Sequence, residues 1–119
     1  MKEPERDSSL ESLWQPMGVK VSRVLEEMRS RGYDPVVFEA RRSMARQRWL
    51  YGVGRTHDLK RKPVTWTMSS RHLVGKAVDI WSKSRGWHWA DFFGALQGEG
   101  RKVGLRGNVK EQDHLEWDG

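Results

Sequence analysis

Residues 70–81 read SRHLVGKAVDIW, and they hold two potential metal ligands, His72 and Asp79, beside a run of apolar residues. In a helix the two side chains would lie two turns, about 10 Å, apart along the axis, which is too far to bind one ion directly. We therefore expect a loop that enters a strand over residues 74–81. Side chains alternate between the two faces of a strand, so the smallest ones share the face of the aspartate and leave space beside it: Gly75 and Ala77.

A second polar stretch, residues 111–117, reads EQDHLEW near the C-terminus. A turn followed by a strand places His114 and Glu116 on one face, with Glu111 near that face. Alternation directs the remaining two residues into the core: Leu115 and Trp117.

Two imidazoles and one carboxylate form a ligand set that suits zinc, and catalytic zinc sites keep three protein ligands with the fourth position open to water. The chain has no cysteine, so disulfides and thiolate metal sites are excluded. Glu111 is the expected general base, with Asp113 as the alternative. Arg42, at the exit of an apolar strand over residues 36–38, is the candidate to stabilise a developing oxyanion.

The rest of the chain predicts a small α+β protein. At 119 residues, 36% of them hydrophobic, the chain has the size of one domain, residues 1–119, with residues 1–12 as a loosely ordered lead-in. Apolar spacing and turn residues predict the helices 18–32, 43–51 and 89–96, the last closed by glycines 98 and 100, and short strands at 64–67, 102–106 and 114–117, with a turn at 107–108. The expected fold class is α+β, with helices packed on a small, mostly antiparallel sheet.

The charge pattern indicates an anionic partner. The net charge is +6, and residues 41–62 contain eight basic residues but only one acidic residue, Asp58. A local positive face suits a nucleic acid, a membrane surface or an acidic wall polymer. Because the apolar runs are only a few residues long and the N-terminus is charged, we expect neither a transmembrane segment nor a secretory signal.

The two polar stretches resemble a known family. The pattern S-x-H-x-x-G-x-A-x-D at residues 70–79, followed by E-x-x-H at 111–114, is similar to the zinc peptidases of the D-Ala-D-Ala carboxypeptidase and dipeptidase group. The segment from Arg42 to Arg55 resembles the one that precedes the metal motif in the phage endolysin branch, the L-alanyl-D-glutamate endopeptidases. Members of this branch often have Asp three residues before the last His and Pro just before it, where this chain has Glu111 and Asp113.

The resemblance implies a role for each matching residue. It implies an α+β fold shared with the hedgehog signalling domain and a Zn²⁺ ion held by three ligands: His72, Asp79 and His114. It assigns Glu111 as the general base and Arg42 as the group that holds the substrate carbonyl or its oxyanion. Four further residues are expected beside the site as orienting or substrate-contacting groups: Ser70, Gln47, Asp113 and Trp117.

The expected function is that of a monomeric zinc peptidoglycan hydrolase, an endolysin that cleaves the L-Ala–D-Glu bond of the stem peptide. Its basic face would hold anionic cell-wall or outer-membrane polymers. It would stay in the host bacterial cytoplasm until a membrane lesion, such as one made by a holin, releases it to the wall. The alternatives are a D,D-carboxypeptidase or D-Ala-D-Ala dipeptidase, a basic nucleic-acid-binding module, and a catalytically silent zinc protein.

Overall fold

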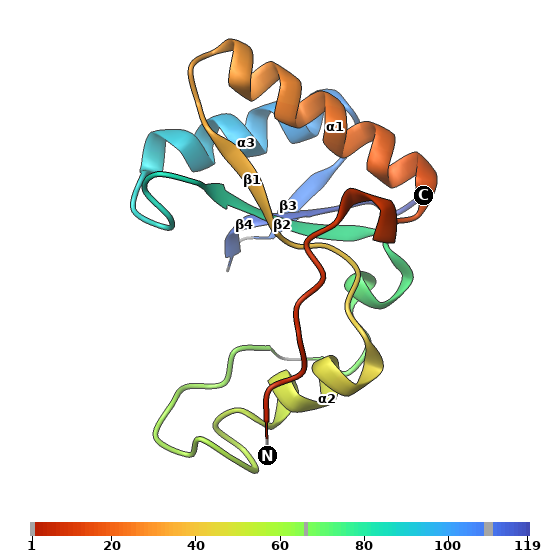
Figure 1. The fold of residues 1–119 in the computed structure, drawn as a ribbon, viewed down its shortest axis with the longest axis vertical. Coiled ribbons are helices and arrows are strands. Elements are labelled where there is room, and N and C mark those ends of the chain that lie inside the picture. The colour runs from red at the N-terminus through yellow and green to blue at the C-terminus, as the bar shows by residue number, and fades with distance from the viewer. Residues whose placement is uncertain (1, 66, 109–110) are drawn as a thin grey trace.

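The computed structural model describes residues 2–65, 67–108 and 111–119, and within these ranges the chain forms helices on a small antiparallel sheet (Figure 1). The elements follow in the order 3-10 turn η1 (Leu10–Ser12), α1 (Gln15–Ser30), β1 (Pro35–Glu39), α2 (Met44–Gly52), 3-10 turn η2 (Arg71–Val74), β2 (Ala77–Ser82), α3 (Ala90–Lys102), β3 (Arg106–Asn108) and β4 (Glu111–Glu116). The expected α+β class is confirmed. None of the helices in the described ranges has the length and apolarity needed to cross a bilayer.

The sheet has the strand order β1-β2-β4-β3, and every neighbouring pair is antiparallel. In this register Glu39 of β1 lies opposite Asp79 of β2, and Asp79 lies opposite His114 of β4. Directly opposed residues have Cβ atoms about 5 Å apart. The register therefore places three ionisable side chains in one row across the sheet.

Helices α1 and α3 cover one face of the sheet, while α2 and the segment that follows it lie on the other side (Figure 1). The helix-covered face holds the core, to which α1 contributes Val21, Val24, Leu25 and Met28. From the sheet, this core includes Val78, Ile80 and Leu115. The opposite face is therefore left for polar groups.

Local sequence signals set the ends of the first two α-helices. Helix α1 begins at Gln15, three residues before the predicted start, with Pro16 in its first turn, and Gly32 follows its end with a φ of 89°. The Ser43 side chain caps the start of α2, because its hydroxyl accepts a hydrogen bond from the Arg46 amide at 3.1 Å.

The predicted end of α3 is wrong, since the helix runs through Gly98 and Gly100 to Lys102. An ideal Cβ on Gly100 would lie only 2.6 Å from Cδ2 of Leu115, so this glycine permits close packing of α3 on β4. Gly104, with a φ of 83°, provides the actual stop. There the Leu105 amide donates to the Gly100 carbonyl at 2.9 Å, and the Gly104 amide donates to the Arg101 carbonyl at 3.1 Å, the pattern of a Schellman motif.

Several predicted strand limits are also wrong. The strand placed at 102–106 lies instead at Arg106–Asn108, because α3 occupies its first residue and Gly104 forms the helix stop. The turn predicted at 107–108 falls inside β3, and β4 begins three residues before its expected start. No strand forms at Val64, Thr65 or Thr67, while residue 66 lies outside the described residues.

Candidate metal and catalytic site

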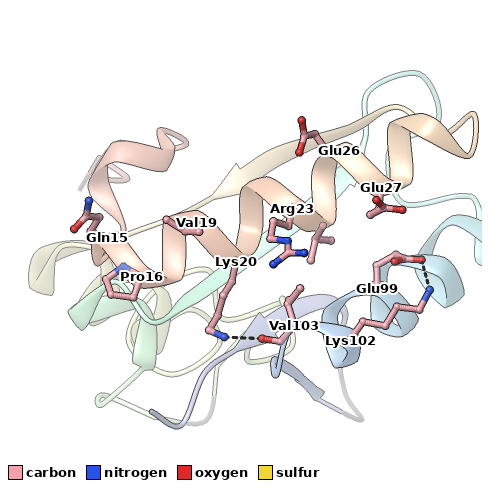
Figure 2. Close-up of a pocket in the computed structure, with 11 residues that line it drawn as sticks. Gln15, Pro16, Val19, Lys20, Arg23, Glu26, Glu27, Glu99, Lys102 and Val103 are labelled. Atoms are coloured by element: carbon pink, nitrogen blue, oxygen red, sulfur yellow. Dashed lines mark hydrogen bonds and ion pairs between the residues drawn. The ribbon is translucent and has the colours of Figure 1, made fainter.

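Among the cavities of the described residues, two lie on opposite sides of the molecule, and the predicted site residues gather at the smaller of these two. The larger cavity, about 940 Å³, lies between α1 and the C-terminal part of α3 (Figure 2), and the residues that line it include no histidine. The smaller cavity, about 410 Å³, is bordered by the polar face of the sheet, by α2 and by residues 64–65, 67 and 69–72. It contains all three predicted metal ligands, so we consider it the candidate functional site.

The three predicted ligands converge on one point. Nε2 of His72 lies 3.3 Å from one carboxylate oxygen of Asp79, and Nδ1 of His114 lies 3.2 Å from the other. One ligand atom from each residue lies within 4.8 Å of the others, and all three side chains are buried. Two nitrogens and one carboxylate oxygen in this arrangement fit the three-ligand set of a catalytic zinc site.

A tight turn brings His72 back to the strand that carries Asp79. The Ser70 hydroxyl caps η2 by accepting a hydrogen bond from the His72 amide at 3.2 Å, and Gly75 ends it in the left-handed conformation with a φ of 71°. A Cβ on Gly75 would lie 2.5 Å from the Trp14 amide nitrogen. Gly75 therefore serves the turn and its contact with the N-terminal segment, rather than the free space beside Asp79 that the sequence suggested.

The outer nitrogen of each histidine is also held. Nδ1 of His72 lies 2.7 Å from the Ala40 carbonyl, which can only accept a hydrogen bond, so this nitrogen carries the proton and Nε2 faces Asp79. Nε2 of His114 lies 2.9 Å from Oε1 of Glu116, which leaves Nδ1 for the inner side. Outer contacts of this kind fix the tautomer and the ring orientation of metal-ligating histidines.

The electrostatics of the three groups favour a bound cation. Burial opposes ionisation of Asp79, but the hydrogen bonds and charges of the two histidines outweigh it and hold the Asp79 pKa well below its usual range. Burial also opposes protonation of His114, yet the hydrogen bond and charge of Asp79 raise the His114 pKa to about 9. A buried carboxylate thus already attracts a positive charge at this position, which a divalent metal would supply in place of the proton.

Arg42 reaches the same cavity from the end of β1. Its guanidinium donates to Oε1 of Gln47 and to Oε1 of Glu39, both at 2.8 Å, and lies 3.7 Å from Asp79. Gln47 is itself fixed through a 2.6 Å hydrogen bond from its amide to the Thr67 carbonyl. Nε of Arg42 is buried and has no hydrogen-bond partner among the described residues. Arg42 is therefore held in place at the border of the cavity.

Glu111 and Asp113 line the cavity from β4. One oxygen of Glu111 lies 3.5 Å from Nδ1 of His114, and the side chain is 42% exposed, so solvent and substrate can reach it. Burial and the charge of Asp79 raise the pKa of Asp113 to about 7. The pairing of β3 with β4 shifts between its ends, because Arg106 is opposite Glu116 and Asn108 is opposite Glu111. This irregularity releases β4 from strict alternation, so Glu111, Asp113 and His114 all border one cavity.

The structure does not bring Trp117 into this cavity. Its ring stacks on Trp14 with a centroid distance of 5.1 Å, at the edge of the hydrophobic core. Trp117 is absent from the described residues that line the site. Leu115, the other residue expected in the core, is fully buried there.

The sequence predicts no role for three charged residues that line the site, although it places the last of them on the face of His114: Glu39, Arg46 and Glu116. Glu39 and Arg46 are buried and form an ion pair, and Glu39 also binds Arg42. Sequence position could have indicated two of them. Glu39 directly follows the apolar residues of β1, and Glu116 lies two residues after a predicted ligand. An acid at the end of an apolar strand is costly to bury unless it is paired.

Comparisons with known proteins agree with this fold. No protein-family model and no curated protein sequence matches the chain. Among solved structures, ChiX, an L-Ala D-Glu endopeptidase from Serratia marcescens, is similar with a TM-score of 0.63 and 23% identity over 95% of this chain and 90% of ChiX. The VanY D,D-pentapeptidase of a VanB-type resistance cassette, solved with Zn(II), has a TM-score of 0.70 and 17% identity over 90% of this chain and 73% of VanY. The LD-carboxypeptidase LdcB has a TM-score of 0.70 and 19% identity over 98% of this chain and 65% of LdcB.

At these identities the likeness establishes the fold. The expected resemblance to the D-Ala-D-Ala peptidase group is confirmed at that level, since the neighbours include endopeptidases, carboxypeptidases and dipeptidases of peptidoglycan or its peptides.

Proposed function

We propose that this protein is a monomeric zinc peptidase that hydrolyses the stem peptide of peptidoglycan at the L-Ala–D-Glu bond, in the manner of a phage endolysin. The observation that carries the proposal is the convergence of His72, Asp79 and His114 in one cavity that also holds Arg42 and Glu111. The fold is shared with peptidases that act on this polymer.

In the proposed hydrolysis the metal ligands and the acidic residues of the cavity have separate roles. A zinc ion held by His72, Asp79 and His114 would supply Lewis acidity and lower the pKa of a bound water. Glu111 accepts the proton of the attacking water and passes it to the amine that leaves when the peptide C–N bond breaks. Its exposure and its position beside His114 suit this exchange. Asp113 is the alternative base, because its pKa near 7 suits proton transfer at neutral pH.

Arg42 orients the scissile carbonyl and stabilises the oxygen as it becomes negative. Glu39 and Gln47 hold the guanidinium in place, and a donor fixed before the reaction costs no reorganisation during it. Because Arg42 lines the cavity, we assign its guanidinium as the donor to the substrate oxygen.

The main alternative is a D,D- or L,D-carboxypeptidase, which the VanY and LdcB structures support equally through their fold. Digestion of purified peptidoglycan by the zinc-loaded protein distinguishes the two cuts. The endopeptidase releases new N-terminal D-Glu, whereas a carboxypeptidase releases free D-Ala. Free D-Ala without new N-terminal D-Glu would overturn the assigned bond, and no hydrolysis of any stem peptide by zinc-loaded protein would overturn the peptidase.

We propose further that the exposed cations of α2 and the following loop hold anionic wall or outer-membrane polymers. Two of the eight basic residues in this stretch, Arg42 and Arg46, are engaged by Glu39 inside the protein. Five others are exposed: Arg41, Arg48, Lys60, Arg61 and Lys62. Helix α2 and the segments on either side of it, which carry these residues, lie on the same side of the sheet as the site (Figure 1), where attraction would concentrate the substrate polymer near the cavity.

Binding to intact walls tests this surface. Charge reversal of Lys60 and Lys62 should weaken cosedimentation with walls several-fold at low salt and have little effect at high salt, because salt screens exposed charges. The matched control reverses Arg23 and Lys83, which are exposed elsewhere. Equal losses in both variants would mean that only net charge matters.

A further inference from the structure

We propose that Glu116 is a positioning residue that fixes His114 for metal binding, and that Arg71 and Arg106 hold Glu116 in turn. The inference rests on the metal site proposed above and concerns residues beyond the ligands. Its first observation is the 2.9 Å contact between Oε1 of Glu116 and Nε2 of His114. This contact occupies the nitrogen that faces away from Asp79.

The second oxygen of Glu116 is bound separately. Oε2 lies 2.8 Å from Nη2 of Arg106 and 3.1 Å from Nε of Arg71. Each oxygen therefore has its own partners, and the carboxylate cannot rotate without losing at least one ion pair. With 15% of its side chain exposed, Glu116 is also shielded from competing water.

The fold positions both arginines. Arg106 is the direct cross-strand neighbour of Glu116 in the pairing of β3 with β4. Arg71 lies in η2 next to His72, and it also donates to the Trp117 carbonyl at 3.2 Å. The Arg71–Glu116 contact therefore links the 3-10 turn that carries one histidine ligand to the strand that carries the other.

This arrangement has a defined chemical consequence for His114. A carboxylate that accepts the Nε2–H keeps the lone pair on Nδ1, which faces Asp79, and makes the ring a stronger donor to a metal. Without Glu116 the ring can rotate or exchange tautomers, so the zinc site loses a preorganised ligand. Losing such an outer partner lowers metal affinity by about 10–100-fold.

Asp118 offers a matched control within the same network. Its two oxygens lie 3.2 Å from Arg71 and 2.8 Å from Arg106, so it shares both arginines with Glu116. No contact with His114 is found for it in the described part of the chain. Removing Asp118 therefore disturbs the ion pairs and leaves the histidine contact in place.

The test compares zinc affinity in Glu116→Ala, Glu116→Gln and Asp118→Ala by competition with a chromophoric chelator. We expect the dissociation constant to rise about 10–100-fold in Glu116→Ala. We expect a rise of only a few-fold in Glu116→Gln, whose amide oxygen still accepts from Nε2–H, and an unchanged value in Asp118→Ala. Thermal unfolding of each metal-free variant verifies that it is folded.

A spectroscopic readout separates positioning from general destabilisation. In zinc-loaded wild type and Glu116→Gln, nitrogen-15 NMR of the histidine rings should show a protected Nε2–H on His114, and in Glu116→Ala this signal should be lost. Wild-type zinc affinity in Glu116→Ala, or an equal loss in Asp118→Ala, would overturn the positioning role while leaving the metal site intact. A wild-type protein that binds no zinc would overturn the metal site and this inference together.

Discussion

The same strands place apolar residues on one face of the sheet and ionisable residues on the other. On the helix-covered face, Val78, Ile80 and Leu115 are fully buried among apolar side chains. Asp79 and His114 border a polar cavity on the other face. Each of them is next in the chain to one of these buried apolar residues. Because alternation separates the two sets by a single residue, a one-residue shift of strand register would exchange core and site.

The two faces also differ in what their burial costs. Burial of the apolar residues stabilises the fold directly. The ionisable row of Glu39, Asp79 and His114 loses hydration, and ion pairs with neighbouring groups offset that cost. Replacing a proposed ligand or base on the cavity face should therefore act mainly on metal binding and hydrolysis, and replacing an apolar group on the helix face should act mainly on stability.

The largest expected effect on the cavity face comes from removing a proposed metal ligand. His72→Ala leaves two protein ligands, so the protein should lose its zinc and hydrolysis should fall by about a thousandfold or more. Metal analysis and release of peptides from purified walls measure the two losses. His88→Ala, which removes an exposed histidine outside the cavity, should retain both. Full activity in His72→Ala would exclude this zinc site.

Removing the base should separate activity from metal content. Glu111→Gln is expected to keep zinc and to lose about 10²–10⁴-fold in kcat, the usual contribution of a general base. Asp113→Asn provides the comparison, because it changes the other carboxylate of β4 that lines the cavity. If Asp113→Asn loses kcat and Glu111→Gln does not, the base is Asp113.

On the helix face the effect should appear in stability. Ile80→Ala removes buried methyl groups next to Asp79 in the chain but on the other side of the sheet. The free energy of unfolding should fall by about 2–5 kcal/mol, measured by denaturant titration of the metal-free protein. Zinc affinity of the folded fraction should be unchanged. A matching loss of affinity would show that the two faces are coupled.

The sequence predicts the site better than it predicts the helix and strand limits, for a physical reason. The convergence of His72, Asp79 and His114 could be predicted because the spacing of these residues and the period of two along a strand are both local properties. The roles of Gly75 and Gly100 depend on the distant Trp14 amide and the Leu115 side chain, so the sequence placed the first beside the site and the second at a helix end. Contacts of this kind are settled only when the elements pack together.

The ionic partners of the site were missed for a related reason. Glu39 and Glu116 acquire their roles from cross-strand register and from arginines on other elements. The irregular pairing of β3 with β4 likewise brings Glu111 and Asp113 to the same cavity as His114, which strict alternation does not allow. The convergence of the three proposed ligands could thus be predicted from sequence, but the groups that contact them could not.

The cavity face should also respond to pH in two opposite ways. The folded His114 pKa of about 9 lies above the ordinary value of 6.5, so its protonation stabilises the metal-free protein fully below pH 6.5, and this contribution is lost as the pH rises through 9. Zinc competes with that proton, so its affinity should rise about tenfold per pH unit below 9 and about 100-fold from pH 6.5 to 8.5.

Calorimetry in buffers of different ionisation enthalpy measures the proton released on zinc binding. We expect about one proton per zinc at pH 7. Binding without proton release would show that His114 is already neutral in the metal-free protein.

The smallest effect concerns two glycines of α3 and tests how independent the faces are. A Cβ on Gly100 would collide with Leu115, the residue after His114, whereas a Cβ on Gly94 would meet no atom within 4 Å. Gly100→Ala should therefore destabilise the fold by about 1–3 kcal/mol through overpacking, and Gly94→Ala should stabilise it by about 0.5–1 kcal/mol because alanine is the better helix former. Thermal and denaturant unfolding measure both shifts. If β4 carries the strain of Gly100→Ala across the sheet, zinc affinity will fall together with stability. If the ion pairs of Glu116 hold His114 as we propose, only stability will change.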